Sequence, residues 1–148
     1  MSNLRLVELD ADNLAAAISI PPQMGEKAYV APVVVSIAEA YVTPTAWPRL
    51  IVDDEEVVGF VMANWDPDND IPEFRGGIWR LNVAEQAKGR GVGRFAVEKI
   101  CEEARRRGYD KITVLWDPSD DGPEQFYLKV GFARTGELFG ETVGTLAV

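Results

Sequence analysis

The residues of this chain whose types and spacing best suit chemistry lie between positions 86 and 94, where the sequence reads Gln-Ala-Lys-Gly-Arg-Gly-Val-Gly-Arg. Three glycines alternate there and leave out side chains that would keep the backbone away from a ligand; they are Gly89, Gly91 and Gly93. An amphipathic stretch follows directly, and the start of a helix offers unpaired N–H groups and the positive end of its dipole. Three basic residues add charge: Lys88, Arg90 and Arg94. The run therefore predicts a cradle for phosphate groups.

Spacing excludes two common cradles of this kind. A P-loop requires the string G-x-x-x-x-G-K-[ST], which occurs nowhere in the chain. The dinucleotide fingerprint G-x-G-x-x-G would need a glycine at position 94, where the sequence has Arg94. The phosphate-bearing ligand is therefore neither a P-loop nucleotide nor a dinucleotide held in the usual way.

A second run with chemical potential reads Phe-Tyr-Leu-Lys-Val-Gly-Phe at positions 126–132. It follows an apolar, strand-like stretch at 112–116. Pro123 suits the first turn of a short helix, and Gly131 suits the left-handed position at its end. Together with Gln86-x-x-Gly89-x-Gly91, this run resembles the two signatures of the GNAT N-acetyltransferase superfamily, and the match covers residues 78–137.

The resemblance implies one α/β (α+β) domain over residues 1–148, with a mixed, mostly antiparallel sheet of about six or seven strands and about four helices. It also implies acetyl-CoA as cosubstrate and direct attack by a primary amine. The residues implied to hold the cofactor are Leu81, Asn82, Val83, Gln86, Lys88, Gly89, Arg90, Gly91, Val92, Gly93 and Arg94. The match does not extend to Asp120, where many members carry asparagine, because an ionised carboxylate cannot donate a hydrogen bond.

The resemblance makes Tyr127 the candidate catalytic acid. A phenol with a pKa near ~10 is protonated at neutral pH and can give its proton to the departing thiolate. The alternative is that Tyr127 only packs beside its aromatic neighbours. For removal of the amine's proton the candidates are Glu73, Glu137 and Glu141, each of which could equally be a solvated surface carboxylate.

A closer resemblance concerns the acceptor. Residues 29–32 (Tyr-Val-Ala-Pro), 36–41, 79–81 and 135–141 look like parts of bacterial diamine and spermine/spermidine acetyltransferases. This implies a small polyamine-like substrate and places residues of the 33–41 helix near its entrance, unless that helix is an ordinary amphipathic one. The candidate acceptor contacts are Ser36, Glu39, Tyr41, Glu73 and Glu141. Three alternatives stay open: an aminoglycoside-like amine, a protein N-terminus, and a non-catalytic acyl-CoA-binding module that would tolerate loss of Tyr127.

Composition narrows the function classes further. The 148 residues contain no histidine, which excludes Ser-His-Asp triads and H-E-x-x-H zinc sites, and no spacing marks a metal site. The net charge of −9 argues against a nucleic-acid partner. The single cysteine, Cys101, fits a core position and a reducing compartment. With no apolar run near twenty residues, we expect no membrane-spanning helix. The single cysteine and the lack of a signal-peptide pattern at the start of the sequence favour the cytoplasm. A homodimer is possible, because dimers are common in this superfamily.

Periodicity predicts the elements in the order β-α-α-β-β-β-α-β-α-β-β. The strands are expected at 4–9, 49–52, 57–65, 78–83, 112–116, 133–138 and 142–148. The helices are expected up to residue 18, at 33–41, from 92 to an end at Gly108, and after Pro123. We expect the basic residues between 88 and 107 to gather around the cradle and the helix that follows it, and the acidic runs at 53–56, 66–70 and 120–124 to lie elsewhere.

Overall fold

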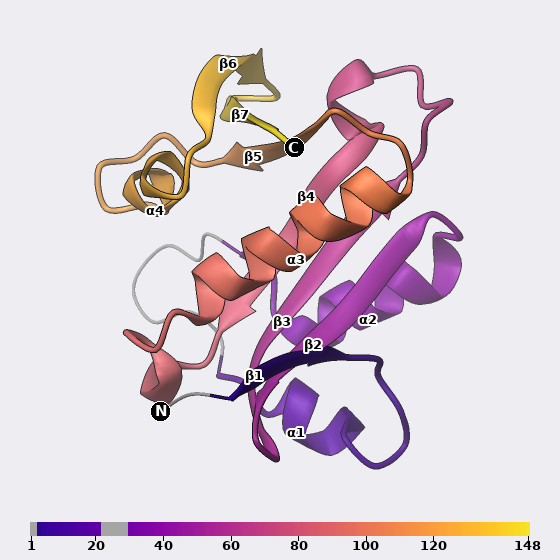
Figure 1. Ribbon diagram of the computed structural model, residues 1–148, viewed down its shortest axis with the longest axis vertical. Helices are drawn as coiled ribbons and strands as arrows, with labels where there is room; N and C mark the ends of the chain where they lie inside the picture. Colours follow the sequence, from indigo (N-terminus) through magenta and orange to yellow (C-terminus); the bar gives the residue numbers. More distant parts are fainter. Residues whose placement is uncertain (1–2, 22–29) are drawn as a thin grey trace.

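The computed structural model describes residues 3–21 and 30–148. Within these ranges seven strands form one sheet in the order β1-β2-β3-β4-β5-β7-β6, with four α-helices around it (Figure 1). Among the pairs that these strands form, only β4–β5 is parallel. The predicted fold class and element order are confirmed. Tyr29, part of the sequence run that suggested a polyamine acceptor, lies outside the described residues.

The elements have the following bounds. The strands are β1 (Leu4–Val7), β2 (Ala46–Asp53), β3 (Glu56–Trp65), β4 (Gly76–Val83), β5 (Lys111–Trp116), β6 (Ala133–Leu138) and β7 (Glu141–Ala147). The helices are α1 (Leu14–Ile18), α2 (Val33–Val42), α3 (Val92–Arg106) and α4 (Glu124–Lys129), with short 3-10 turns η1 (Pro72–Phe74) and η2 (Glu85–Ala87). No helix within these described elements is long and apolar enough to cross a membrane.

Helices cover both faces of the sheet, and alternation along β3 shows how the sequence achieves this. Phe60 and Met62 pack with the residues of α1 and α2, whereas Val61 and Ala63 pack with α3. The apolar stripe predicted for α3 is buried, and Cys101 lies within it. In Figure 1, α3 crosses the sheet on one side while α1 and α2 lie on the other.

The β4 strand begins two residues earlier than predicted, at a pair of glycines. A Cβ at Gly77 would overlap the backbone of Thr113 on β5, and a Cβ at Gly76 would meet the ring of Tyr109. These close approaches require glycine, so the pair belongs to the strand and not to a loop.

The strands β4 and β5 pair over a very short distance. Only Gly77 with Thr113 and Ile78 with Val114 are in register, after which the two strands separate. The β3–β4 register shifts at the same point, because Met62 faces Arg80 while Ala63 faces Ile78, which leaves Trp79 as a bulge. Figure 1 shows β5, β6 and β7 diverging from the β1–β4 half of the sheet.

Candidate functional site

A cleft of 710 Å³ opens where β4 and β5 separate. Its walls come from β4 (Ile78 to Leu81), from β5 (Val114 to Trp116) and from Tyr127 on α4. Further lining residues come from the segment before α2, from η1 and from the β6–β7 turn. Since separated strands leave backbone groups unpaired along their facing edges, the cleft can bind a ligand that carries amides.

The predicted cradle lies at the N-terminus of α3. Gly91 is the N-cap with φ 80°, no described side chain caps the helix, and the first bonded amide is that of Phe95, which donates to the Gly91 carbonyl at 3.0 Å. Gly89 also has a positive φ, 87°, and a Cβ at either glycine would have no atom within 4 Å. The space beside Gly89 and Gly91 is therefore open at the positive end of the α3 dipole, which suits a phosphate.

Gly93 has a different reason to be glycine. A Cβ there would lie 2.8 Å from the ring of Phe126 on α4. The third glycine of the run thus lets α3 and α4 pack closely, and only Gly89 and Gly91 border open space.

The predicted separation of charges is wrong at the cradle. Arg90 forms ion pairs with Asp53 at 3.3 Å and Glu56 at 3.1 Å, and these hydrogen bonds raise its pKa. The acidic β2–β3 hairpin therefore lies beside the cradle, because β3 pairs with the end of β4 and places its own start there. Lys88 pairs with Glu85 at 3.0 Å. Arg94 is exposed on the first turn of α3.

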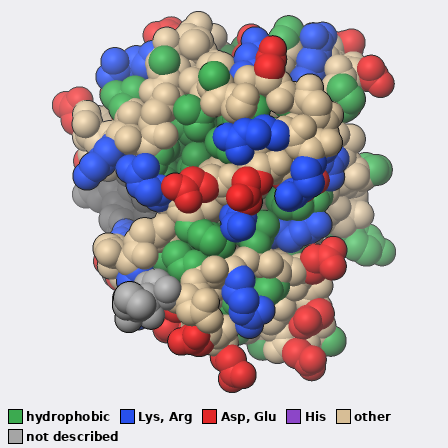
Figure 2. All heavy atoms as spheres, in the orientation of Figure 1, with side chains coloured by type: hydrophobic (Ala, Val, Ile, Leu, Met, Phe, Trp, Pro, Cys, Tyr) green, Lys and Arg blue, Asp and Glu red, His purple; other side chains and the backbone are tan. Residues whose placement is uncertain are grey.

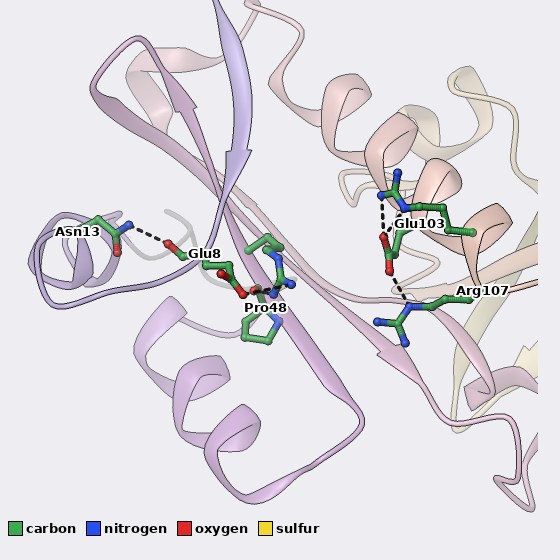
Figure 3. A network of polar contacts seen from close by, with 7 residues as sticks. Glu8, Asn13, Pro48, Glu103 and Arg107 are labelled. Atoms are coloured by element: carbon green, nitrogen blue, oxygen red, sulfur yellow. Dashed lines mark hydrogen bonds and ion pairs between the residues drawn. The ribbon is translucent and has the colours of Figure 1, made fainter.

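The basic run 105–107 ends the helix that follows the cradle, as predicted, but lies away from the cradle itself. It forms the opposite end of α3, about 20 Å along the helix axis. Arg106 and Arg107 bind the carboxylate of Glu103 at 2.6 and 2.8 Å (Figure 3). Burial would raise the pKa of Glu103, but these two hydrogen bonds outweigh it and lower the pKa. Figure 2 shows Lys and Arg side chains intermixed with Asp and Glu over the face that α3 covers.

The three predicted cofactor residues on β4 have different surroundings. Leu81 lines the cleft. Asn82 is only 7% exposed and donates from Nδ2 to the carbonyl of Ala31 at 3.0 Å, so its side chain joins β4 to the start of α2. Val83 packs against the α3 side of the core. The chain then continues to Gln86, whose carbonyl accepts a hydrogen bond from Arg90. The cradle run 86–94 thus follows the cleft along the chain at the end of β4.

Tyr127 lies between the aromatic part of the core and the cleft. It is 7% exposed, stacks on Trp116 with centroids 5.3 Å apart and planes at 12°, and lines the cleft. It also meets Phe126 and Phe132 edge-on. Burial raises the pKa of its hydroxyl, which keeps the phenol protonated. A thiol in the same apolar cleft would have its pKa raised for the same reason.

A carboxylate holds α4 against the sheet next to Tyr127. Glu124 accepts hydrogen bonds from Arg134 on β6, at 2.9 Å to each oxygen, and from Nε1 of Trp116 at 3.1 Å. These bonds, that of Arg134 above all, lower the pKa of Glu124 to about 2. The indole that stacks on Tyr127 is thereby fixed from its polar edge.

The predicted acceptor residues divide into two groups. Glu73 and Glu141 line the cleft. On α2, Ser36 is fully buried, Glu39 pairs with Arg80 at 3.1 Å, and Tyr41 is 91% exposed, and none of the three lines the cleft. The inner face of α2 packs on the sheet, and Glu39 contacts the cleft lining through Arg80. Glu137 and Asp120 are exposed and also lie outside the lining.

Sequence reasoning missed several lining residues. Arg80 hydrogen-bonds the carbonyl of the bulged Trp79 at 3.1 Å and so holds the bulge to Glu39 of α2. Asp66, Phe74 and Phe139 also line the cleft. The acidic 66–70 run was visible in the sequence and lies in the connection between β3 and β4, but the sequence did not show that Asp66 lines the cleft.

Comparison with known proteins gives a consistent family match. A model of the family described as "Acetyltransferase (GNAT) family" matches residues 35–132. N-acetyltransferase 8F1 of Rattus norvegicus is 33% identical over 86 residues, which cover 57% of this chain and 38% of that protein. Mycothiol acetyltransferase of Jonesia denitrificans is 29% identical over 83 residues, covering 56% of this chain and 25% of that protein. The matches therefore span well under half the length of these curated relatives.

Solved structures resemble this chain over nearly its full length. PaiA N-acetyltransferase from Thermoplasma acidophilum, in complex with coenzyme A, superposes with a TM-score of 0.72 at 12% identity, covering 99% of each chain. An acetyltransferase from Thermus thermophilus gives 0.71 at 19% identity and full coverage of both chains. The ribosomal-protein-S18-alanine N-acetyltransferase of Escherichia coli gives 0.69 at 15% identity, covering 99% of this chain and 93% of that chain. At these identities the likeness establishes the fold.

Proposed function

Because this chain belongs to the acetyltransferase (GNAT) family, we propose that it transfers the acetyl group of acetyl-CoA to a primary amine of a small cationic acceptor, with a polyamine-like amine as the leading candidate. The observation that carries the proposal is the combination of an uncapped α3 N-terminus with a cleft that opens at the β4–β5 separation and is lined by Tyr127. Relatives and structural neighbours named as N-acetyltransferases support it.

The residues present fit acetyl-CoA. Gly89, Gly91 and the first-turn amides of α3 would hold its diphosphate, and the free edge of β4 near Leu81 would hold the amide-bearing arm. When bound, the cosubstrate supplies the thioester. In the transfer a C–N bond forms to the amine, the C–S bond breaks, and Tyr127 gives its proton to the departing sulfur.

The charges of the cleft favour a cationic acceptor. Within the described part of the chain, three carboxylates line it, those of Asp66, Glu73 and Glu141. The positive charge of Arg80, also in the lining, is balanced by its ion pair with Glu39. Electrostatic attraction therefore draws an ammonium group into the cleft.

The amine must lose a proton before or during attack. At pH 7 an amine with a pKa of ~10.4 is neutral in only about one molecule in ~2,500. Glu73 and Glu141 are the candidate bases, directly or through water, since both line the cleft.

Release of free thiol from acetyl-CoA, measured with a panel of amines, tests the proposal. Tyr127→Phe keeps the ring that stacks on Trp116 and removes only the hydroxyl, so we expect kcat to fall by about 10²-fold or more. The melting temperature and acetyl-CoA affinity should stay close to those of the wild type. Unchanged turnover would contradict the acid role of Tyr127.

The same panel separates the alternatives. Binding of acetyl-CoA without turnover of any amine would favour the non-catalytic acyl-CoA-binding module. Turnover confined to aminoglycosides or to peptides with a free N-terminus would keep the reaction and replace the acceptor.

A further inference from the structure

Two aromatic rings from different parts of the chain stack at the cleft. Phe74 ends η1, and Phe139 lies in the turn between β6 and β7. Their centroids are 6.1 Å apart with planes at 27°, and both residues line the cleft. Phe139 remains 73% exposed, so one large apolar side chain stays open to solvent at this position.

The backbone of Phe139 makes this exposure unusual. Leu138 pairs directly with Glu141, so Phe139 and Gly140 form a two-residue hairpin loop, with φ 52° and 78°. Such a turn requires positive φ at both positions and favours Asn, Asp or Gly at the first. A phenylalanine there costs about 1 kcal/mol or more. Neither turn chemistry nor burial accounts for the ring, whereas strained residues often occur where a protein contacts a ligand.

Carboxylates accompany both rings. Glu73 precedes Phe74 in the chain, Glu141 follows the Phe139 turn, and both glutamates line the cleft. A ring face attracts a cation through its quadrupole, and a nearby carboxylate adds Coulomb attraction. The combination suits an ammonium group better than a neutral or anionic one.

We propose that Phe74 and Phe139, with Glu73 and Glu141, form a subsite for a second cationic centre of the acceptor, one that is not itself acetylated. The inference rests on the proposed function and deepens it: the acceptor carries two separated ammonium groups, one of which reacts while the other is held by the ring pair. An acceptor molecule with a single amine would lack the contact with the ring pair.

The test compares an α,ω-diamine with the n-alkylamine of the same chain length. Phe139→Leu removes the ring and keeps an apolar side chain, and Phe139→Tyr keeps the ring as a matched control. We expect Phe139→Leu to lower the ratio of kcat/KM for the diamine to that for the monoamine by about 3- to 30-fold. Phe139→Tyr should retain the ratio, and both variants should have similar melting temperatures.

Two results would overturn the subsite. One is an unchanged ratio in Phe139→Leu, which includes equal losses on both amines; the other is the same fall of the ratio in Phe139→Tyr. Calorimetric titration of the two amines into the protein with coenzyme A separates this from the proposed function. If no amine is turned over but the diamine binds in a Phe139-dependent way, the proposed transfer fails and the subsite stands. If amines are turned over but neither the kcat/KM ratio nor diamine binding depends on Phe139, the proposed transfer stands and the subsite fails.

Discussion

Replacing Gly91 by valine tests whether the backbone at the start of α3 holds the diphosphate of coenzyme A. Gly108, at the other end of the same helix, provides the matched control. The two glycines have φ values of 80° and 85°, and at neither would a Cβ have an atom within 4 Å. Backbone strain is therefore alike in Gly91→Val and Gly108→Val, and only the first change places a side chain at the start of α3, where the diphosphate is proposed to bind.

The strain can be estimated from the left-handed backbone. An L-residue in this region costs about 1–2 kcal/mol. For a chain of this size each kcal/mol lowers the melting temperature by about 2–4 °C, so both variants should melt about 2–8 °C below the wild type. Coenzyme A affinity should fall more than about tenfold in Gly91→Val, equivalent to more than about 1.4 kcal/mol, and change little in Gly108→Val.

Calorimetric titration with coenzyme A, together with thermal unfolding of each variant, measures both effects. Gly91→Ala serves where the valine variant is too unstable, because it keeps a smaller obstruction at the same place. Equal affinities in the two valine variants would refute the placement of the diphosphate, since strain alone would then explain every change.

Two further predictions concern the framework of the site. Hydrogen bonds from Arg134 and Trp116 lower the pKa of Glu124 from 4.5 to about 2. The stability that the wild type gains over Glu124→Gln should therefore be complete above pH 4.5 and disappear as the pH falls toward 2. Thermal unfolding of both proteins across this range measures the difference in stability, and a difference independent of pH would contradict the assignment. Gly77→Ala should lower the free energy of unfolding by about 3 kcal/mol because its Cβ would overlap the backbone of Thr113. Gly136→Ala, whose Cβ would have no neighbour within 4 Å, should change it by less than about 0.5 kcal/mol. Urea unfolding compares the two variants, and equal losses of stability would show that the close β4–β5 contact does not cause the loss in Gly77→Ala.

The sequence alone determined the features that depend on local chemistry. The period of the apolar residues in α3, the glycines at its start and the turn residues between strands are properties of neighbouring positions, and they predicted the element order and the cradle. The aromatic run around Tyr127 could be singled out for the same reason, because its residues are close in sequence and resemble a family signature.

Only the tertiary structure decided which distant residues meet. The partners of Arg90 are two acidic residues of the β2–β3 hairpin, which the order of strands brings to the cradle. The cleft is lined from separate segments because β4 and β5 part after two residue pairs, and Phe139 enters the lining through a hairpin turn that its residue type does not favour. Strand order, register and close backbone approach are set by packing across the whole sheet, and no local pattern encodes them.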